Sequence, residues 1–441
     1  MFKNIKAALS KIHPAKAMLL GYFIYALLGW FVLMMPICHV EHVSHTDNLF
    51  TAISALSTTG LSTVNLVKDY SVVGQVVMLV LIQIGGIGFM TFNTFVVLAT
   101  LHKISHLRKK VASTEVSLPK DFVISEFISH VIIYTLACEL IGAVILSLIF
   151  MDYGIENPIW NGVFHSIAAF CTAGFSLFPD NLVSFKYDLG INLTISFLSI
   201  LGALGFIVWM DFYKKFTGKT KHLRFITKVI LGATFCFISI GTLLFFLSEE
   251  PFTQGSIYDK VIISFFQVVT ASTTTGFNTV DIGILQPAVI VLLFILMAFG
   301  AAPAGTGGGL KNTTFVTLIG LVKSSLTGQN IVTFWGRQIP PKRVQLATTI
   351  FSYYAFTLTF FIFLLVTVED KPFLPLLFEA ASAIGTVGLT MDVTPNLTEL
   401  GKILISILMF MGKMSILTFG IALVSQTNEK IAPKKIEEFV F

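Results

Sequence analysis

The feature that most constrains this chain is a repeated alternation of long and short apolar segments. Each long segment can cross a bilayer as a helix, which needs about 20 mostly apolar residues. The long segments cover residues 15–36, 72–100, 127–151, 188–213, 226–247, 286–300 (continuing past 310), 343–368 and 398–425. A shorter apolar segment lies inside each successive pair, at residues 47–58, 159–172, 260–274 and 373–385. The short segments cannot span, so they are predicted to be half-helices that enter the membrane and return.

A pattern of four residues recurs once in each long–short–long set. Counted back from a glycine, a Thr stands two positions earlier, an Ala five and a Phe ten, which gives F-x4-A-x2-T-x-G. The Phe and Ala positions are interpreted as packing of the half-helix. Four copies in register with the hydropathy indicate four internal repeats. The predicted repeats span 1–100, 101–216, 217–325 (with a broken second helix) and 326–441 (with a C-terminal tail).

The composition and the repeats together predict the fold class. Only 12% of the residues are charged and 55% are apolar, whereas a soluble domain carries roughly twice that charged fraction. The chain is therefore predicted to be an all-α membrane protein. Its eight spanning helices and four re-entrant half-helices would surround one central pore.

The T-x-G segments are predicted to bind a cation. After each half-helix the chain would return outward in an extended form, and four such segments around one axis would present a ring of backbone carbonyls. Such a ring replaces the hydration shell of a cation, and the C-terminal ends of the half-helices add partial negative charge. The predicted ion-binding residues are Thr58, Thr59, Gly60, Thr172, Ala173, Gly174, Thr274, Thr275, Gly276, Thr386, Val387 and Gly388.

A polar residue also stands nine positions before each of these glycines. These residues are Thr51, His165, Gln267 and Glu379. They are interpreted as anchors that hold the half-helices in place by hydrogen bonds, without a direct role in binding the ion.

The second long segment of the third repeat contains an insertion. In the other repeats a run from a glycine to an aromatic residue covers 85–92, 202–209 and 412–419, but here it covers 300–315 and is longer by about eight residues. Glycine and proline at membrane depth predict a loop beneath the T-x-G segments that obstructs the pore. A simple kinked helix is the alternative. The predicted gate residues are Gly300, Pro303, Gly305, Gly307, Gly308, Gly309, Lys311 and Lys413.

Lys413, Lys311 and Glu139 lie within long apolar segments, away from the ends of those segments. Lys413 is near the centre of the last one, where a charge indicates function, and its expected partners are carbonyls of the 300–311 loop. Alternatively, Lys413 only repels cations and sets a barrier. Lys311 is expected to reach the inner interface, and Glu139 to pair within the helix bundle.

The distribution of basic residues predicts that both termini are cytoplasmic. With that topology, the only Lys or Arg residues outside are Lys68, Lys186, Lys260, Lys371 and Lys402. The outer face is rich in acidic residues, which would raise the local cation concentration. Basic clusters at 103–110, 214–224 and 337–343 are interpreted as topology signals that contact anionic lipid headgroups.

The motifs STTGLS, CTAGFS, TTTGFN and GTVGLT resemble those of the Trk/Ktr/HKT superfamily of potassium transporters. The length and the eight spans resemble the KtrB-type membrane subunit of bacterial Ktr systems, over essentially the whole chain. The resemblance implies potassium uptake across the cell membrane, a loop gate, a homodimer, and a cytosolic nucleotide-binding ring of RCK/KTN type. It implies no cofactor in this chain beyond the transported potassium, with sodium as a candidate activator, and no nucleic-acid partner. The family often carries Arg at the place of Lys413. Compared with tetrameric potassium channels, only the fourth repeat here reads T-V-G and none has the full TVGYG, so weaker selectivity is expected.

Two other classes of function are considered. A sodium-coupled potassium symporter also fits broken helices and repeats, although no pair of intramembrane carboxylates for ion coupling is evident in the sequence. An enzyme or a scaffold is not supported, since the sequence shows no catalytic triad, metal-ligand set or acid pair.

Overall fold

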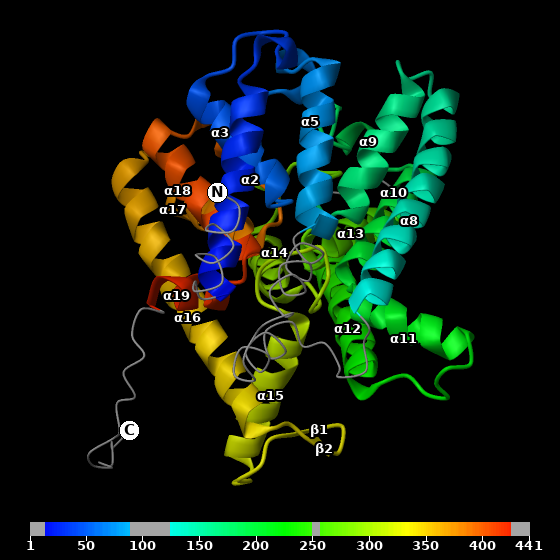
Figure 1. Cartoon of the computed structure of the whole chain (residues 1–441), viewed down its shortest axis with the longest axis vertical. Coiled ribbons are helices and arrows are strands. Elements are labelled where there is room, and N and C mark those ends of the chain that lie inside the picture. The colour runs from blue at the N-terminus through cyan, green and yellow to red at the C-terminus, as the bar shows by residue number, and fades with distance from the viewer. Residues whose placement is uncertain (1–13, 89–123, 249–255, 425–441) are drawn as a thin grey trace, which may run out of the picture.

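The structure is a computed structural model that describes residues 14–88, 124–248 and 256–424. The predicted boundary between the first two repeats and the basic cluster at 103–110 lie outside these residues, as does the end of the C-terminal tail. The described chain is predominantly helical (Figure 1). Its strands form one small hairpin, β1 (Thr333–Phe334) with β2 (Arg337–Gln338), between the third and fourth groups of helices.

The helices form four groups, each with a first long helix, a half-helix and a second helix. The first group is α2 (Pro14–Leu33), α3 (His45–Leu56) and α5 (Val72–Gln83), with the one-turn α4 (Leu66–Asp69). The second is α8 (Ile124–Asp152), α9 (Pro158–Phe170) and α10 (Leu189–Ala203), followed by α11 (Phe206–Phe216). The third is α12 (Phe225–Ser248), α13 (Ile257–Ser272) and α14 (Pro287–Phe299), followed by α15 (Asn312–Leu326). The fourth is α16 (Pro341–Val368), α17 (Phe373–Gly385) and α18 (Glu399–Lys413), followed by α19 (Ile416–Val424).

The sequence explains where the half-helices begin. The side chains of Ser44 and Ser256 cap α3 and α13 by accepting the amides of Asp47 and Asp259 at 3.1 and 3.2 Å. Pro158 starts α9, where its fixed φ suits the first helical position and no amide is needed.

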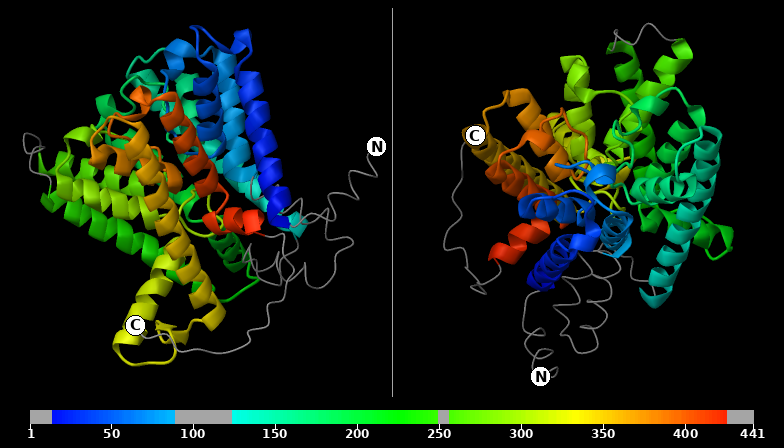
Figure 2. Two further views of the ribbon diagram at one scale, coloured as in Figure 1. Left: turned by 90° about the vertical axis from the view of Figure 1, so that its left-hand side faces the viewer. Right: turned by 90° about the horizontal axis from the view of Figure 1, so that it is seen from above.

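The four groups close into a ring. Each half-helix packs between the two long helices of its own group. Each second helix also packs against the half-helix of the next group: α5 against α9, α10 against α13, α14 against α17, and α18 back against α3. The view from above shows the groups around a common centre (Figure 2, right). This is the predicted architecture of repeated helix units around one axis.

Several of the eight predicted spanning segments are not single straight helices within the described residues. Among the described residues, only three helices are long and apolar enough to cross a membrane unbroken: Ser129–Asp152, Phe225–Ser248 and Pro341–Val368. All three are first helices. The pair α10 and α11 passes the same test together, but it is bent by 91°.

Two of the second helices break where the backbone takes a positive φ. Gly205 has φ +84° at the bend between α10 and α11, and Ser415 has φ +64° between α18 and α19. A right-handed helix cannot continue through such dihedrals. The segments 188–213 and 398–425 are therefore not the straight spans that hydropathy suggested. In the first group, α5 passes into a π-helical turn, η2 (Ile84–Gly88), and residues 89–100 lie outside the described chain.

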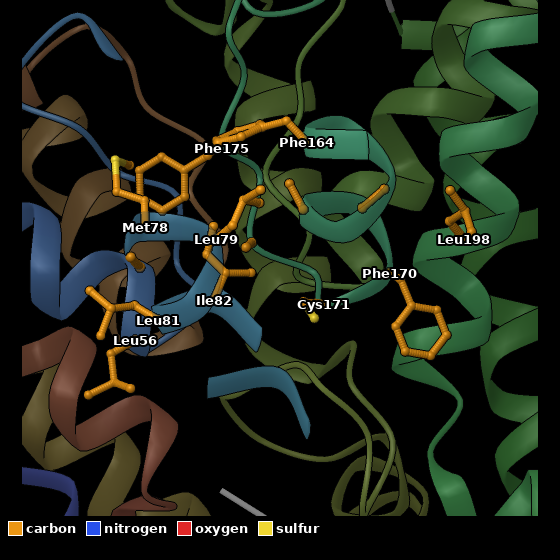
Figure 3. Close-up of a cluster of buried hydrophobic side chains, with 14 of the residues drawn as sticks. Leu56, Met78, Leu79, Leu81, Ile82, Phe164, Phe170, Cys171, Phe175 and Leu198 are labelled. Atoms are coloured by element: carbon orange, nitrogen blue, oxygen red, sulfur yellow. The ribbon is translucent and has the colours of Figure 1, made fainter. Parts of the chain in front are cut away.

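The core lies where the half-helices meet the second helices. One cluster contains Leu56, Met78 and Ile82 of the first group together with Phe164, Phe170 and Phe175 of the second (Figure 3). The Phe ten positions before each ring glycine is at most 1% exposed in all four groups, which agrees with the packing interpretation: Phe50, Phe164, Phe266 and Phe378. The first helices instead expose large apolar side chains outward, such as Ile133 and Leu140 of α8, as lipid contact requires.

Candidate ion pathway

The four T-x-G segments share one backbone conformation. In each, the Thr that follows the half-helix is left-handed and the glycine also has a positive φ. The φ values are 52°, 53°, 56° and 51° for Thr58, Thr172, Thr274 and Thr386, and 93°, 63°, 89° and 97° for Gly60, Gly174, Gly276 and Gly388. Two of the three residues in each segment thus have a positive φ, so the segment is not a regular extended strand. A β-branched residue in the left-handed region is unusual and strained, and such strain gathers at functional sites.

The four glycines meet around a single axis. A Cβ added to Gly60 would lie 2.3 Å from the carbonyl oxygen of Ala173, the residue before the next ring glycine. The same test gives 2.3 Å from Gly174 to the Thr275 oxygen and 2.0 Å from Gly276 to the Val387 oxygen. Gly388 closes the circle at 2.2 Å from the Thr59 oxygen. Every glycine thus packs against a carbonyl of the next segment, and only glycine fits. We call these twelve residues, three per segment, the T-x-G ring.

One backbone hydrogen bond turns the chain at the end of every half-helix. The amide of the middle ring residue donates to the carbonyl five positions earlier. The pairs are Thr59–Ser54 (2.9 Å), Ala173–Ala168 (2.7 Å), Thr275–Thr270 (2.8 Å) and Val387–Ser382 (2.8 Å). These bonds satisfy backbone groups that lipid could not.

A second set of glycines brings the second helices against the half-helices. A Cβ on the first glycine of each aligned run would lie within 2.2 Å of the carbonyl oxygen four positions before the ring glycine. The pairs are Gly85–Leu56 (2.0 Å), Gly202–Phe170 (1.9 Å), Gly300–Ser272 (1.8 Å) and Gly412–Ile384 (2.2 Å). The alignment that identified the insertion in the third repeat therefore matches equivalent points in space.

The inserted segment crosses directly beneath the four ring threonines. Thr306 Oγ1 lies 3.0 Å from Thr172 Oγ1, and the Gly308 amide donates to Thr386 Oγ1 at 2.8 Å. A Cβ on Gly307 would lie 2.1 Å from Thr274 Oγ1. The segment 301–311 is irregular between α14 and α15 (Figure 1), so it is a loop and not a kinked helix.

The loop is tied to the second helix of the second group. The Ala302 and Thr306 amides donate to the carbonyls of Ala203 and Gly202 at 3.1 and 3.2 Å, and the Phe206 amide donates to Ala304 at 3.0 Å. The bend at Gly205 exposes these groups to the loop. Sequence reasoning missed this contact, although the glycines of the GALGF run were its visible signal.

Two lysines hold the loop from different sides. Lys413 is 8% exposed, and its Nζ donates to the Thr306 carbonyl and, at 2.6 Å, to Thr58 Oγ1. Lys311 does not turn to the inner interface as predicted: its Nζ donates to the Gly307 and Gly308 carbonyls at 2.7 and 3.2 Å. These carbonyls belong to the same loop, three and four positions before Lys311.

A cavity of about 600 Å³ lies on the other side of the loop. It is lined by loop residues, by both lysines and by parts of α11, α12, α15, α16 and α19, but by no residue of the T-x-G ring. The loop therefore separates the ring from this cavity.

Glu139 pairs within the bundle. Both of its carboxylate oxygens accept from Gln83 Nε2, at 3.0 and 2.9 Å, and its carbonyl accepts from Ser166 at 2.7 Å. This joins α8 to the end of α5 and to α9. Over the described ranges, no group of three or more His, Cys, Asp or Glu side chains could hold a metal ion.

Comparison with known proteins places the chain in a family. The TrkH family, described as cation transport protein, matches residues 23–431. The Ktr system potassium uptake protein B of Bacillus subtilis (strain 168) is 37% identical over 411 residues, 92% of both chains. The potassium/sodium uptake protein NtpJ of Enterococcus hirae is 31% identical over 76% of both.

A solved structure shares the fold. The potassium transporter TrkH from Vibrio parahaemolyticus aligns with a TM-score of 0.72 at 20% identity, over 93% of this chain and 84% of that one. This likeness shows that the two chains share a fold. The chain described here belongs to the TrkH family of cation transport proteins, as a membrane protein of the Trk/Ktr type.

Proposed function

We propose that this protein takes up potassium through a selective, channel-like pore in the cell membrane, with both termini in the cytoplasm. The observation that carries the proposal is the closed ring of T-x-G segments, in which each glycine faces the carbonyl of the next segment. Several of the most similar relatives are named as potassium uptake proteins.

The twelve residues of the T-x-G ring are the proposed ion-binding site. Backbone carbonyls at its axis replace the water around a dehydrated cation. The glycines are needed because any side chain would overlap the neighbouring carbonyl at about 2 Å. The proposed site binds the ion through main-chain oxygens, without a cofactor bound to this chain.

The loop 301–311 is the proposed gate, with Gly300 as its start. It blocks the path between the T-x-G ring and the inner cavity, and Pro303 and its glycines give it an irregular backbone. Lys413 and Lys311 stabilise the closed position through the carbonyls of Thr306, Gly307 and Gly308. Opening requires these bonds to break, so the gate has a defined closed state.

Regulation is proposed to come from a separate cytosolic subunit, a nucleotide-binding ring of the RCK/KTN type, acting on a homodimer of this chain. The name of the Bacillus subtilis relative, a protein of a Ktr system, supports a multi-component assembly. The hairpin β1–β2 carries an exposed Trp335 beside the basic segment 337–343 and offers a contact surface. It lies at the end of the molecule far from the half-helices (Figure 1).

A sodium-coupled symporter is the second candidate, favoured by the printed name of the Enterococcus hirae relative, a potassium/sodium uptake protein. The two mechanisms differ in stoichiometry. A symporter carries potassium only with sodium, whereas sodium as an activator changes the potassium flux without moving in a fixed ratio.

The proposal is tested by growth of a potassium-uptake-deficient cell at limiting potassium, with the chain alone and with an RCK-type partner. The wild type should restore growth, and deletion of residues 301–309 should raise the potassium flux at equal expression. Single-channel currents in a bilayer support the channel, and a fixed sodium-to-potassium ratio supports the symporter. No rescue by either form at normal expression refutes the proposal.

A further inference from the structure

The polar residues nine positions before the ring glycines do more than anchor their half-helices. Thr51, His165, Gln267 and Glu379 are all 0% exposed. Three of these side chains reach the segment that follows the ring glycine of their own group. They therefore connect the half-helix to the outer end of the T-x-G ring.

Glu379 makes the strongest of these connections. Its Oε2 accepts from Thr390 Oγ1 at 2.9 Å, and its Oε1 accepts from the Thr394 hydroxyl. Thr390 is two positions after Gly388, and Thr394 is buried at the start of the next short turn. One carboxylate thus holds two points of the outer segment.

His165 makes the equivalent connection in the second group. Its Nδ1 lies 2.8 Å from the Asn161 carbonyl, which only accepts, so the hydrogen is assigned to Nδ1. Its Nε2, at 2.9 Å, then accepts from the hydroxyl of Ser176, two positions after the ring glycine. The imidazole also stacks on Phe277, which follows the ring glycine of the third group, with ring centres 6.0 Å apart.

The other two groups differ. Gln267 Oε1 accepts from the Thr279 amide at 3.3 Å, a weaker contact one position further along. In the first group no hydrogen bond described by the structure joins Thr51 to the segment after Gly60. There, the Ser62 hydroxyl donates to Val64 of its own segment at 2.7 Å.

We infer that Glu379 and His165 are positioning residues that set the ion selectivity of the T-x-G ring. The order of contacts around the ring places their groups on opposite sides of the axis. Each side chain fixes a residue two positions from a ring glycine. A ring held in this way resists the inward movement that a smaller cation than potassium requires. The inference rests on the proposed function.

The experiment measures the potassium-to-sodium permeability ratio from reversal potentials, together with total flux and melting temperature. Thr390→Val removes the hydroxyl at constant shape, and Glu379→Leu removes the carboxylate. Thr390→Val should lower the ratio about fivefold, the factor that corresponds to one net hydrogen bond, and Glu379→Leu, which removes two, should lower it by roughly 5- to 30-fold. Glu379→Gln keeps a side chain that can bond both hydroxyls, so it should stay within about twofold of wild type.

Thr51→Val is the matched control. Thr51 also stands nine positions before a ring glycine, but no described hydrogen bond joins its side chain to the segment after Gly60. Thr51→Val should leave the ratio unchanged. A role confined to folding would lower flux and melting temperature in the variants while the ratio stays constant. If Thr390→Val and a folded Glu379→Leu both keep the wild-type ratio, the inference is overturned and the proposed function stands. If the wild type itself does not prefer potassium, both are overturned.

Discussion

Replacing Lys413 by Met removes the charge inside the membrane and keeps an unbranched side chain of similar length. The lysine donates to the Thr306 carbonyl of the loop and to Thr58 of the T-x-G ring. A hydrogen bond from a charged donor contributes about 1.5–3 kcal/mol. Loss of the loop contact alone should therefore shift the closed-to-open ratio by roughly 10- to 150-fold. Since a mostly closed gate limits flux, we expect Lys413→Met to raise potassium flux at least about tenfold.

The assay is uptake of radioactive rubidium by proteoliposomes that contain equal amounts of purified protein. Lys413→Arg is the matched control, because it keeps a charged donor and should raise flux much less. The deletion of residues 301–309 separates two explanations. If Lys413 acts through the loop, adding Lys413→Met to the deletion should change little, because the two changes remove the same interaction.

The competing explanation is that Lys413 repels cations as a fixed barrier. In that case Lys413→Met would raise flux by the same factor with and without the loop. Equal factors in both backgrounds, or a Lys413→Met flux at or below wild type, would refute the gate reasoning.

Three further predictions concern the T-x-G ring and the packing around it. Gly276→Ser places a side chain 2.0 Å from the Val387 oxygen at φ +89° and should abolish potassium preference in flux assays, whereas Gly328→Ser, also at positive φ but in open space, should not. Gly412→Ala brings a methyl 2.2 Å from the Ile384 oxygen and should lower the free energy of unfolding by about 1–3 kcal/mol, seen as a lower melting temperature in detergent. Gly283→Ala, whose nearest contact is at 3.2 Å, is the control. Equal melting temperatures of the two variants would contradict the packing argument. Lys402→Met breaks a 2.8 Å pair with Asp47 whose side chains are 11% and 15% exposed, and should cost about 3 kcal/mol. Lys68→Met is the control, because Lys68 pairs with Glu41 and both side chains are more than half exposed; it should barely change the melting temperature. If Lys68→Met lowers the melting temperature as much as Lys402→Met, burial does not explain the effect.

Much of the fold could be predicted because a membrane imposes strict rules on the sequence. Half-helices and their T-x-G segments repeat a short pattern whose glycines are fixed by backbone crowding. The insertion of Pro303 and its neighbouring glycines was also readable, because helix-breaking residues at membrane depth need a special environment.

Local backbone turns could not be predicted in the same way. Gly205 and Ser415 break two apolar segments that hydropathy scores as continuous. Ser415 has a left-handed φ, which serine rarely adopts and which its residue type therefore does not predict. The left-handed φ of Thr58 and its equivalents is likewise imposed by the packed half-helix end. Neither the composition nor the hydrophobic periodicity of the sequence predicts these left-handed residues.

Long-range contacts of single side chains were the other limit. Lys311 binds the carbonyls of Gly307 and Gly308 because the loop folds back over it, which a count of residues from the interface does not reveal. The pair of Asp47 with Lys402 joins the first and fourth groups, and only the closed ring brings these distant positions together.

If main-chain oxygens of the T-x-G ring bind a dehydrated cation, heavy substitutes for potassium should occupy the same place. Anomalous X-ray diffraction from crystals soaked in rubidium or thallium can locate these ions. We expect a peak on the axis between the carbonyls of Thr59, Ala173, Thr275 and Val387, and loss of that peak in Gly276→Ser. An empty ring in well-occupied crystals, or a peak only among acidic side chains elsewhere, would contradict this mode of binding.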